Sequence, residues 1–223
     1  MRRVTRANAR APGTGLAPMI TLYTYGTPNG HKASILLEEL GLTYKVQAVD
    51  FMGGENRTPD YLRISPIGKL PALIENLPDG TERRLFGSGA ILLFHAEAAG
   101  RLIPRETNAR AEALSWLMLG LSDLGPTAVD MFRFSVRAPE KLPYAIDLFK
   151  GELVRCYTAL ERRLSEVEYL AGEYSVADIA CFPFINAAAQ ASSELLPRFP
   201  SLGRWRDAIA ARPAVKRGLA VPG

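Results

Sequence analysis

The sequence predicts a small mixed-sheet α/β domain followed by an all-helical domain. Strand and helix signals alternate up to Gly100, and only helical patterns follow from Thr107 onward. The chain has 223 residues, 48% hydrophobic and 22% charged, which suits one large domain or two small ones. This composition excludes a disordered or collagen-like chain. We expect domains at residues 19–100 and 107–223.

The net positive charge comes from the beginning of the chain. Formally 27 basic residues face 23 acidic ones, but residues 1–18 hold four arginines and no acidic residue. Without this segment the two kinds are equal in number, so we expect neither a nucleic-acid-binding face nor a nucleic-acid partner. We expect residues 1–18 to form a disordered extension upstream of a natural start at Met19.

Neither a membrane span nor a disulfide framework is predicted. The most apolar stretch, residues 176–189, is interrupted by Asp, Pro and Asn, and the chain has only two cysteines, Cys156 and Cys181. We expect both to be buried packing residues in a reducing, cytoplasmic setting. The two distant histidines, His31 and His95, predict no metal site.

The first part of the chain has the element order βαβ and then ββα. Apolar residues at i, i+3, i+4 and i+7 predict a helix from His31 to Gly41. The short turn Pro78-Asp79-Gly80 predicts an antiparallel hairpin. The expected strands are 20–25, 44–48, 70–75 and 82–86, and the other expected helices are 59–64 and 88–99.

The second part reads as a helical bundle. Its longest helix, at residues 146–167, has apolar residues at steps of three and four. Ser175 and Asp178 have the S-x-x-D spacing of a capping box, which is a structural motif. An aromatic patch lies near several bases, and core packing explains most of it; its residues are Phe132, Phe134, Tyr144 and Phe149, with Arg133, Arg137 and Lys141 close by.

The turn between the first strand and the first helix is the candidate reactive corner. In a thioredoxin-type sheet, free N–H groups and the helix dipole at this corner favour a thiolate. Here the corner, residues 27–32, reads TPNGHK and contains no cysteine. A sulfur nucleophile would therefore come with a bound thiol, to which Thr27 and Asn29 would donate hydrogen bonds. By itself the motif also fits an ordinary turn with a helix cap.

Two further positions support the interpretation of this corner as a binding site for a thiol. A trans Pro71 at the start of a strand would remove a ladder hydrogen bond, so we expect a cis Leu70–Pro71 bond that turns the Leu70 backbone outward. Ser88 is placed to cap the next helix, and its N–H and hydroxyl can bind a carboxylate there. Capping alone is the alternative interpretation of Ser88.

Four segments in the same order resemble the glutathione S-transferase family. They are TPNGHK at 27–32, PDYLRISPIGKLPALI at 59–74, SGAILL at 88–93 and SVADIACFPFINA at 175–187. The chain is similar to the nu class, which includes glutathione-dependent disulfide-bond oxidoreductases and the yeast nitrogen-regulator prion domain. The resemblance implies a thioredoxin-like N-terminal domain, a helical C-terminal domain and a homodimer.

The resemblance also implies roles for individual residues. Thr27 and Asn29 would lie at the glutathione sulfur, and the Leu70 backbone would pair with the cysteinyl moiety as an added strand. Ser88 would hold the γ-glutamyl carboxylate. Glutathione would then be a co-substrate, with no permanently bound cofactor and no metal.

Three other positions concern the two ends of glutathione. Lys69 and Asn56 match positions that contact the glycyl carboxylate, although Asn56 is shorter than the usual Gln or His. Gly87 stands where the family usually has Glu or Gln against the γ-glutamyl end. The loss of a charge-assisted hydrogen bond costs about 1.5–3 kcal/mol, which would weaken binding by an order of magnitude or more.

Three functions therefore remain open. The leading one is a glutathione transferase-like enzyme whose bound thiolate attacks a small electrophile or a disulfide; two bound glutathiones could exchange with a disulfide without any protein cysteine. In that case some rings of the aromatic patch would line the second-substrate pocket. The alternatives are a non-catalytic binding or regulatory protein with a degraded site, marked by Gly87, and a transferase that uses a related thiol.

Overall fold

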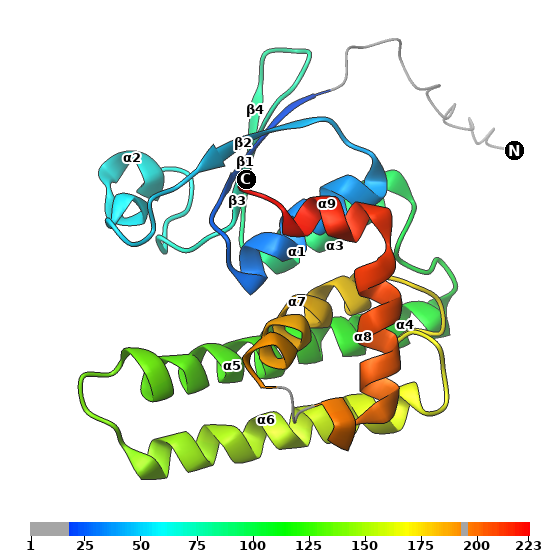
Figure 1. The fold of residues 1–223 in the computed structure, drawn as a ribbon. Helices are drawn as coiled ribbons and strands as arrows, with labels where there is room; N and C mark the ends of the chain where they lie inside the picture. The colour runs from blue at the N-terminus through cyan, green and yellow to red at the C-terminus, as the bar shows by residue number, and fades with distance from the viewer. Residues whose placement is uncertain (1–17, 193–195) are drawn as a thin grey trace, which may run out of the picture.

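The computed structural model describes residues 18–192 and 196–223 and has the two-part architecture that the sequence predicts (Figure 1). A four-stranded sheet with its helices is followed by a helical part. The elements of the first part are β1 (Met19–Thr24), α1 (Pro28–Leu40), β2 (Tyr44–Ala48), α2 (Pro59–Leu62), β3 (Ala72–Asn76), β4 (Glu82–Phe86) and α3 (Ser88–Ala99). The expected extension lies outside the described residues, except for Pro18. The division at residues 100–106 stays a prediction.

The sheet has the strand order β2-β1-β3-β4. Strands β1 and β2 are parallel, whereas β3 runs antiparallel to both β1 and β4, which confirms the predicted hairpin. Tyr23 of β1 lies opposite Ala72 of β3, and Ala72 lies opposite Phe86 of β4. The end of β1, the start of β3 and the end of β4 therefore meet at one edge. Strand β3 begins two residues later than expected because Pro71 has no N–H for the ladder.

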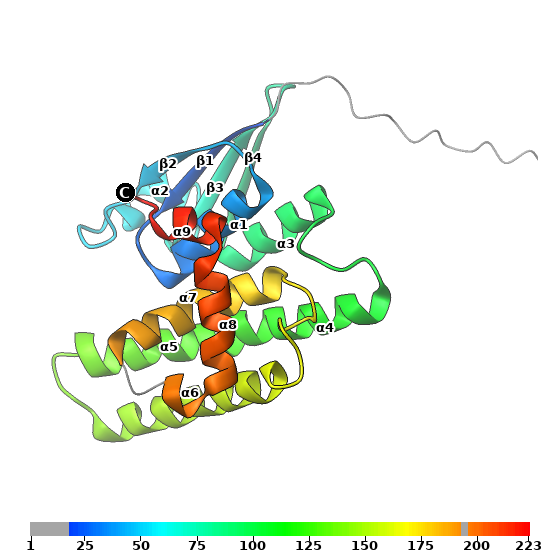
Figure 2. The same ribbon diagram turned by 45° about the vertical axis from the view of Figure 1, so that its right-hand side comes forward.

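Alternate residues of the sheet enter two separate cores. Ile20, Leu22 and Leu73 belong to the main core with α1 and α3, which cover one face of the sheet (Figure 2). Ala72 belongs to a smaller cluster with Tyr61 of α2. This division follows from the two-residue period of a strand.

Helix α1 begins at Pro28, three residues earlier than predicted. Thr27 is its N-cap, with extended backbone, and the Thr27 hydroxyl accepts a 3.2 Å hydrogen bond from the Gly30 N–H. Proline suits the first helical position, because its missing N–H would have no partner there. Asn29 therefore lies in the first turn of α1. The helix ends at Gly41 in the left-handed conformation, as its sequence position predicts.

Where the structure describes the second part, its regular elements are helices, with two isolated β-bridges within residues 169–173. Its helices are α4 (Thr107–Met118), the π-helical η2 (Leu119–Leu124), α5 (Gly125–Phe132), the π-helical η3 (Arg133–Arg137), α6 (Pro143–Leu164), α7 (Val176–Ala191), α8 (Pro200–Ala211) and α9 (Pro213–Leu219). Short 3₁₀ turns occur at Glu55–Arg57 and Leu196–Arg198. Helix α9 returns to pack on α1 (Figure 1). None of the helices described here could cross a membrane.

The predicted capping box at the start of α7 is confirmed. The Ser175 hydroxyl accepts from the Ala177 N–H, and the Asp178 carboxylate accepts from the Ser175 N–H. Asp178 is fully buried and also accepts a 2.8 Å hydrogen bond from Trp205 Nε1 of α8. This carboxylate therefore fastens α7 to α8.

Candidate functional site

The three segments predicted to form the site meet at one edge of the sheet. Thr27 follows β1, Leu70 precedes β3 and Ser88 follows β4. The strand register places these three strand ends side by side, and neighbouring strands are about 4.8 Å apart. The topology thus brings the start of α1, the peptide of Leu70 and the start of α3 to one place.

Thr27 and Asn29 have free donors at the start of α1. The Thr27 oxygen accepts from Gly30, which leaves the hydroxyl hydrogen free to donate. Within the described chain, the half-buried Asn29 amide has no hydrogen-bond partner. In the first turn of α1, Pro28 has no N–H and the Gly30 N–H is bonded to Thr27, so among the described residues the Asn29 N–H is the backbone donor left unpaired. This corner therefore offers donors and a positive dipole end to an anion.

Neither cysteine supplies a thiolate to this corner. Cys181 lies on α7, and burial raises the pKa of its thiol to about 12. Cys156 lies on α6, and burial raises the pKa of its thiol as well. Cys156 is half-buried rather than buried as expected, because it lies at the edge of the bundle core. Sulfur chemistry at Thr27 would need a thiol from a ligand.

The Leu70–Pro71 peptide bond is cis, as predicted. Among the residues described, the Leu70 N–H and carbonyl have no hydrogen-bond partner. An extended peptide laid along Leu70 would find a free donor and a free acceptor there. The backbone of Leu70 can thus pair with an extended peptide as a neighbouring strand.

Ser88 is not the cap of α3, contrary to the prediction. Gly87 is the N-cap residue and makes no side-chain cap bond, whereas Ser88 is the first residue of the helix. Ser88 is buried, and within the described chain its hydroxyl has no partner. Its N–H and hydroxyl therefore remain unused at the amino end of α3, where a carboxylate is favoured.

Asn56 and Lys69 lie in the loop that leads to Leu70. The Asn56 amide group is buried and donates a 2.7 Å hydrogen bond to the Gly68 carbonyl. The Lys69 carbonyl accepts from the hydroxyls of Tyr61 and Ser65, while its side chain is exposed. Asn56 thus holds the loop, and Lys69 is free to meet an anion.

The aromatic patch is more exposed than core packing predicts. Phe134 stacks on Phe149 with 5.5 Å between ring centroids, but Phe132 is 52% exposed and Tyr144 81% exposed. The prediction that core packing explains most of the patch is wrong for these two rings, because about half or more of their surface is exposed.

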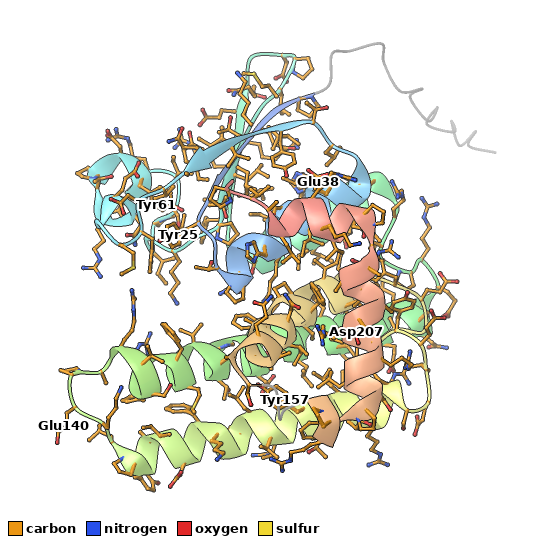
Figure 3. All side chains as sticks on the ribbon, viewed as in Figure 1. Tyr25, Glu38, Tyr61, Glu140, Tyr157 and Asp207 are labelled. Atoms are coloured by element: carbon orange, nitrogen blue, oxygen red, sulfur yellow. The ribbon has the colours of Figure 1, made fainter. Side chains whose placement is uncertain are left out.

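One contact between the two parts was not predicted. The Arg137 guanidinium of η3 lies 5.9 Å from the ring centroid of Phe51, in the loop after β2. The ring centroids of Phe51 and Tyr25 are 6.1 Å apart. Tyr25 lies two residues before Thr27 in the sequence. Figure 3 shows Tyr25 on the side of the sheet domain that carries α2 and Tyr61. Arg137 and Phe51 therefore connect the helical part to the loop that lies against Tyr25, close to the candidate site.

The fold and this cysteine-free corner define a protein of the glutathione transferase type, and comparisons with known proteins agree. Residues 18–97 match the model of the glutathione S-transferase N-terminal domain, and residues 127–213 match that of the C-terminal domain. The chain belongs to the glutathione S-transferase family.

Relatives include an enzyme and two ligand-bound structures. The disulfide-bond oxidoreductase YfcG of Escherichia coli is 42% identical over 90% of this chain and 94% of its own. A Burkholderia graminis glutathione transferase with two glutathione molecules bound per subunit has a TM-score of 0.85 at 37% identity, covering 92% of this chain and 88% of that one. One from Pseudomonas putida, with one glutathione disulfide bound per subunit, has a TM-score of 0.85 at 34% identity over 92% of both chains.

Proposed function

We propose that this protein reduces disulfides with glutathione, and that Thr27 and Asn29 hold the glutathione thiolate. The observation that carries this proposal is the meeting of Thr27, the unpartnered Leu70 peptide and Ser88 at one sheet edge that has no cysteine. The name of the 42% identical relative favours disulfide reduction over conjugation. The structures with two glutathiones or glutathione disulfide favour it as well.

The remaining site residues bind the peptide in this proposal. The Leu70 backbone pairs with the cysteinyl moiety, and Ser88 receives the γ-glutamyl carboxylate at the amino end of α3. Lys69 meets the glycyl carboxylate, because its ammonium is exposed beside Leu70. Asn56 acts through the loop that it fastens, since its amide group already donates to Gly68.

Two glutathiones complete the reaction without a protein sulfur. The first thiolate attacks one sulfur of the disulfide, forms a mixed disulfide and releases the other sulfur as a thiolate. The second glutathione thiolate attacks the glutathione sulfur of the mixed disulfide, which releases the remaining substrate thiolate and forms glutathione disulfide. Two electrons pass from two glutathiones to the substrate, and the two thiol protons end on the released thiols.

The setting of the enzyme is also part of the proposal. Membership of the family supports a homodimer. A reducing cytoplasmic location suits two free cysteines, Cys156 and Cys181. Small electrophiles remain possible second substrates at the same thiolate.

The test compares glutathione-dependent turnover of hydroxyethyl disulfide with that of a haloaromatic acceptor. We expect the disulfide to be the better substrate. The double variant T27A/N29A should lower turnover more than it raises KM, because less of the bound glutathione is then ionised to the attacking thiolate, while Leu70 and Ser88 still bind the peptide. Unchanged rates in the double variant would reject these roles.

Two binding outcomes separate the alternatives. A thermal shift with glutathione but no turnover of either substrate would indicate a non-catalytic binding protein. No shift with glutathione but a shift with a related thiol would indicate a transferase that uses a different thiol.

A further inference from the structure

Lys32 carries a buried positive charge one turn along α1 from the candidate thiolate site. Its side chain is only 1% exposed and enters the helical part of the molecule. The Lys32 ammonium lies 3.5 Å from the carbonyl oxygen of Gly120 in η2 and 4.7 Å from the ring centroid of Phe184 in α7.

The helical part surrounds this ammonium closely. A Cβ at Gly120 would lie 2.9 Å from the Cys181 sulfur and 3.0 Å from Cβ of Ala180, so η2 lies directly against α7 at this point. Phe184 lies on the same helix, one turn beyond Ala180. The contacts of the Lys32 ammonium thus come from two elements of the second part, whereas Lys32 itself belongs to the first.

No carboxylate compensates this charge in the part of the chain that the structure describes. Within residues 18–192 and 196–223, no ion pair includes Lys32. The titratable group that faces it from α7 is the neutral Cys181 thiol, and its neighbour on α1, His31, has its pKa lowered by burial. One long carbonyl contact and one ring do not replace the lost hydration of an ammonium, and burial lowers the pKa of Lys32 to about 8. The buried charge of Lys32 therefore lowers the free energy of unfolding.

We propose that Lys32 is a positioning residue for the glutathione thiolate: its buried charge adds to the positive amino end of α1 and stabilises the thiolate without touching it. Lys32 is three residues from Asn29, about 4.5 Å along the helix axis. Two unit charges about 10 Å apart at an effective dielectric constant of about 20 shift a pKa by about one unit. This inference rests on the proposed function.

The test is an ultraviolet titration of the thiol of glutathione bound to the full-length protein, with thermal unfolding in parallel. K32M removes the charge at similar length, and K32Q removes the charge but keeps a donor for the Gly120 carbonyl. The matched control is K45M, which removes an exposed ammonium from β2. We expect both Lys32 variants to raise the pKa of the bound thiol by about one unit and to melt no lower than the wild type.

The outcomes separate this inference from the function on which it rests. An unchanged thiol pKa in K32M and K32Q, beside an ionised thiol in the wild type, would overturn the role of Lys32 alone. Failure of both variants to fold would also overturn it, because the buried charge would then be needed for stability. If the wild-type protein does not ionise bound glutathione, the proposed function itself is contradicted, whatever the Lys32 variants show.

Discussion

The peptide N–H of Gly87 donates a 3.1 Å hydrogen bond to the carbonyl oxygen of Pro71. This bond ties the start of α3 to the start of β3, the two segments that would hold the γ-glutamyl and cysteinyl parts of glutathione. Gly87 has φ +84°, a conformation that costs other residues free energy, and a Cβ there would meet no atom within 4 Å. The glycine therefore removes strain where the family usually has Glu or Gln.

We expect Gly87→Glu to bind glutathione more tightly and to be less stable. The added carboxylate can meet the glutathione ammonium, which lowers Kd by up to about tenfold. The positive φ at position 87, with ψ +129°, strains a residue that has a Cβ and should lower the free energy of unfolding by about 1–3 kcal/mol. Calorimetric titration and urea unfolding measure the two effects. Gly80→Glu is the control, since Gly80 has φ +83° and open space in a remote turn; equal affinities of the two variants would contradict the prediction.

Thr27→Asp separates helix capping from thiolate stabilisation. Aspartate is a good N-cap and can accept from the Gly30 N–H as Thr27 does, so the melting temperature should stay near that of the wild type. An ionised aspartate cannot donate to a thiolate and repels it, so turnover should fall by about tenfold or more. Thr27→Ser keeps both functions and should stay active. Full activity of the aspartate variant would show that residue 27 acts only as a cap.

The unfolding free energy should depend on pH through Lys32. Below about pH 8 Lys32 is charged in both states, so the full cost of burying the charge is present. Between pH 8 and 10.5 the unfolded chain binds a proton that the folded chain does not, so stability from this group rises with pH. The stability advantage of K32M over wild type should therefore shrink by about 3 kcal/mol from pH 7 to 10.5. A difference that does not vary with pH would disprove this.

Asp178→Ala should destabilise the helical part strongly. The buried Asp178 carboxylate accepts from the N–H groups of Leu170 and Ser175 and from Trp205 Nε1. Its loss leaves buried donors unpaired and should lower the unfolding free energy by about 3 kcal/mol or more. The control on the same helix as Trp205 is Asp207→Ala, whose side chain is 68% exposed and labelled in Figure 3; we expect a change within about 0.5 kcal/mol. Similar losses in both variants would be incompatible with this role.

Periodicity and turn residues predicted most of the fold because they are local signals. The strands at 44–48 and 82–86, the antiparallel hairpin and the helix at 88–99 have the predicted bounds. The start of α1 was placed too late, because the apolar stripe begins after the cap and first turn that Thr27 and Pro28 form. Hydrophobic periodicity thus identifies the buried face of a helix more accurately than its first residue.

The site was only partly visible in the sequence because distant segments complete it. Thr27, Leu70 and Ser88 were identified by their motifs, but the hydrogen bond of Asn56 to Gly68 depends on how the loop folds. Lys32 did leave a signal, since it lies four residues before Leu36 within the apolar stripe of α1. A charged residue in such a stripe indicates a buried charge, but its surroundings come from η2 and α7.

A crystal structure of the protein with reduced glutathione tests the central claim most directly. We predict the glutathione sulfur within hydrogen-bond distance of the Thr27 hydroxyl, with the cysteinyl backbone paired to Leu70. Solvent beside Thr27 in crystals equilibrated with saturating glutathione, or a sulfur directed away from the start of α1, would contradict the account.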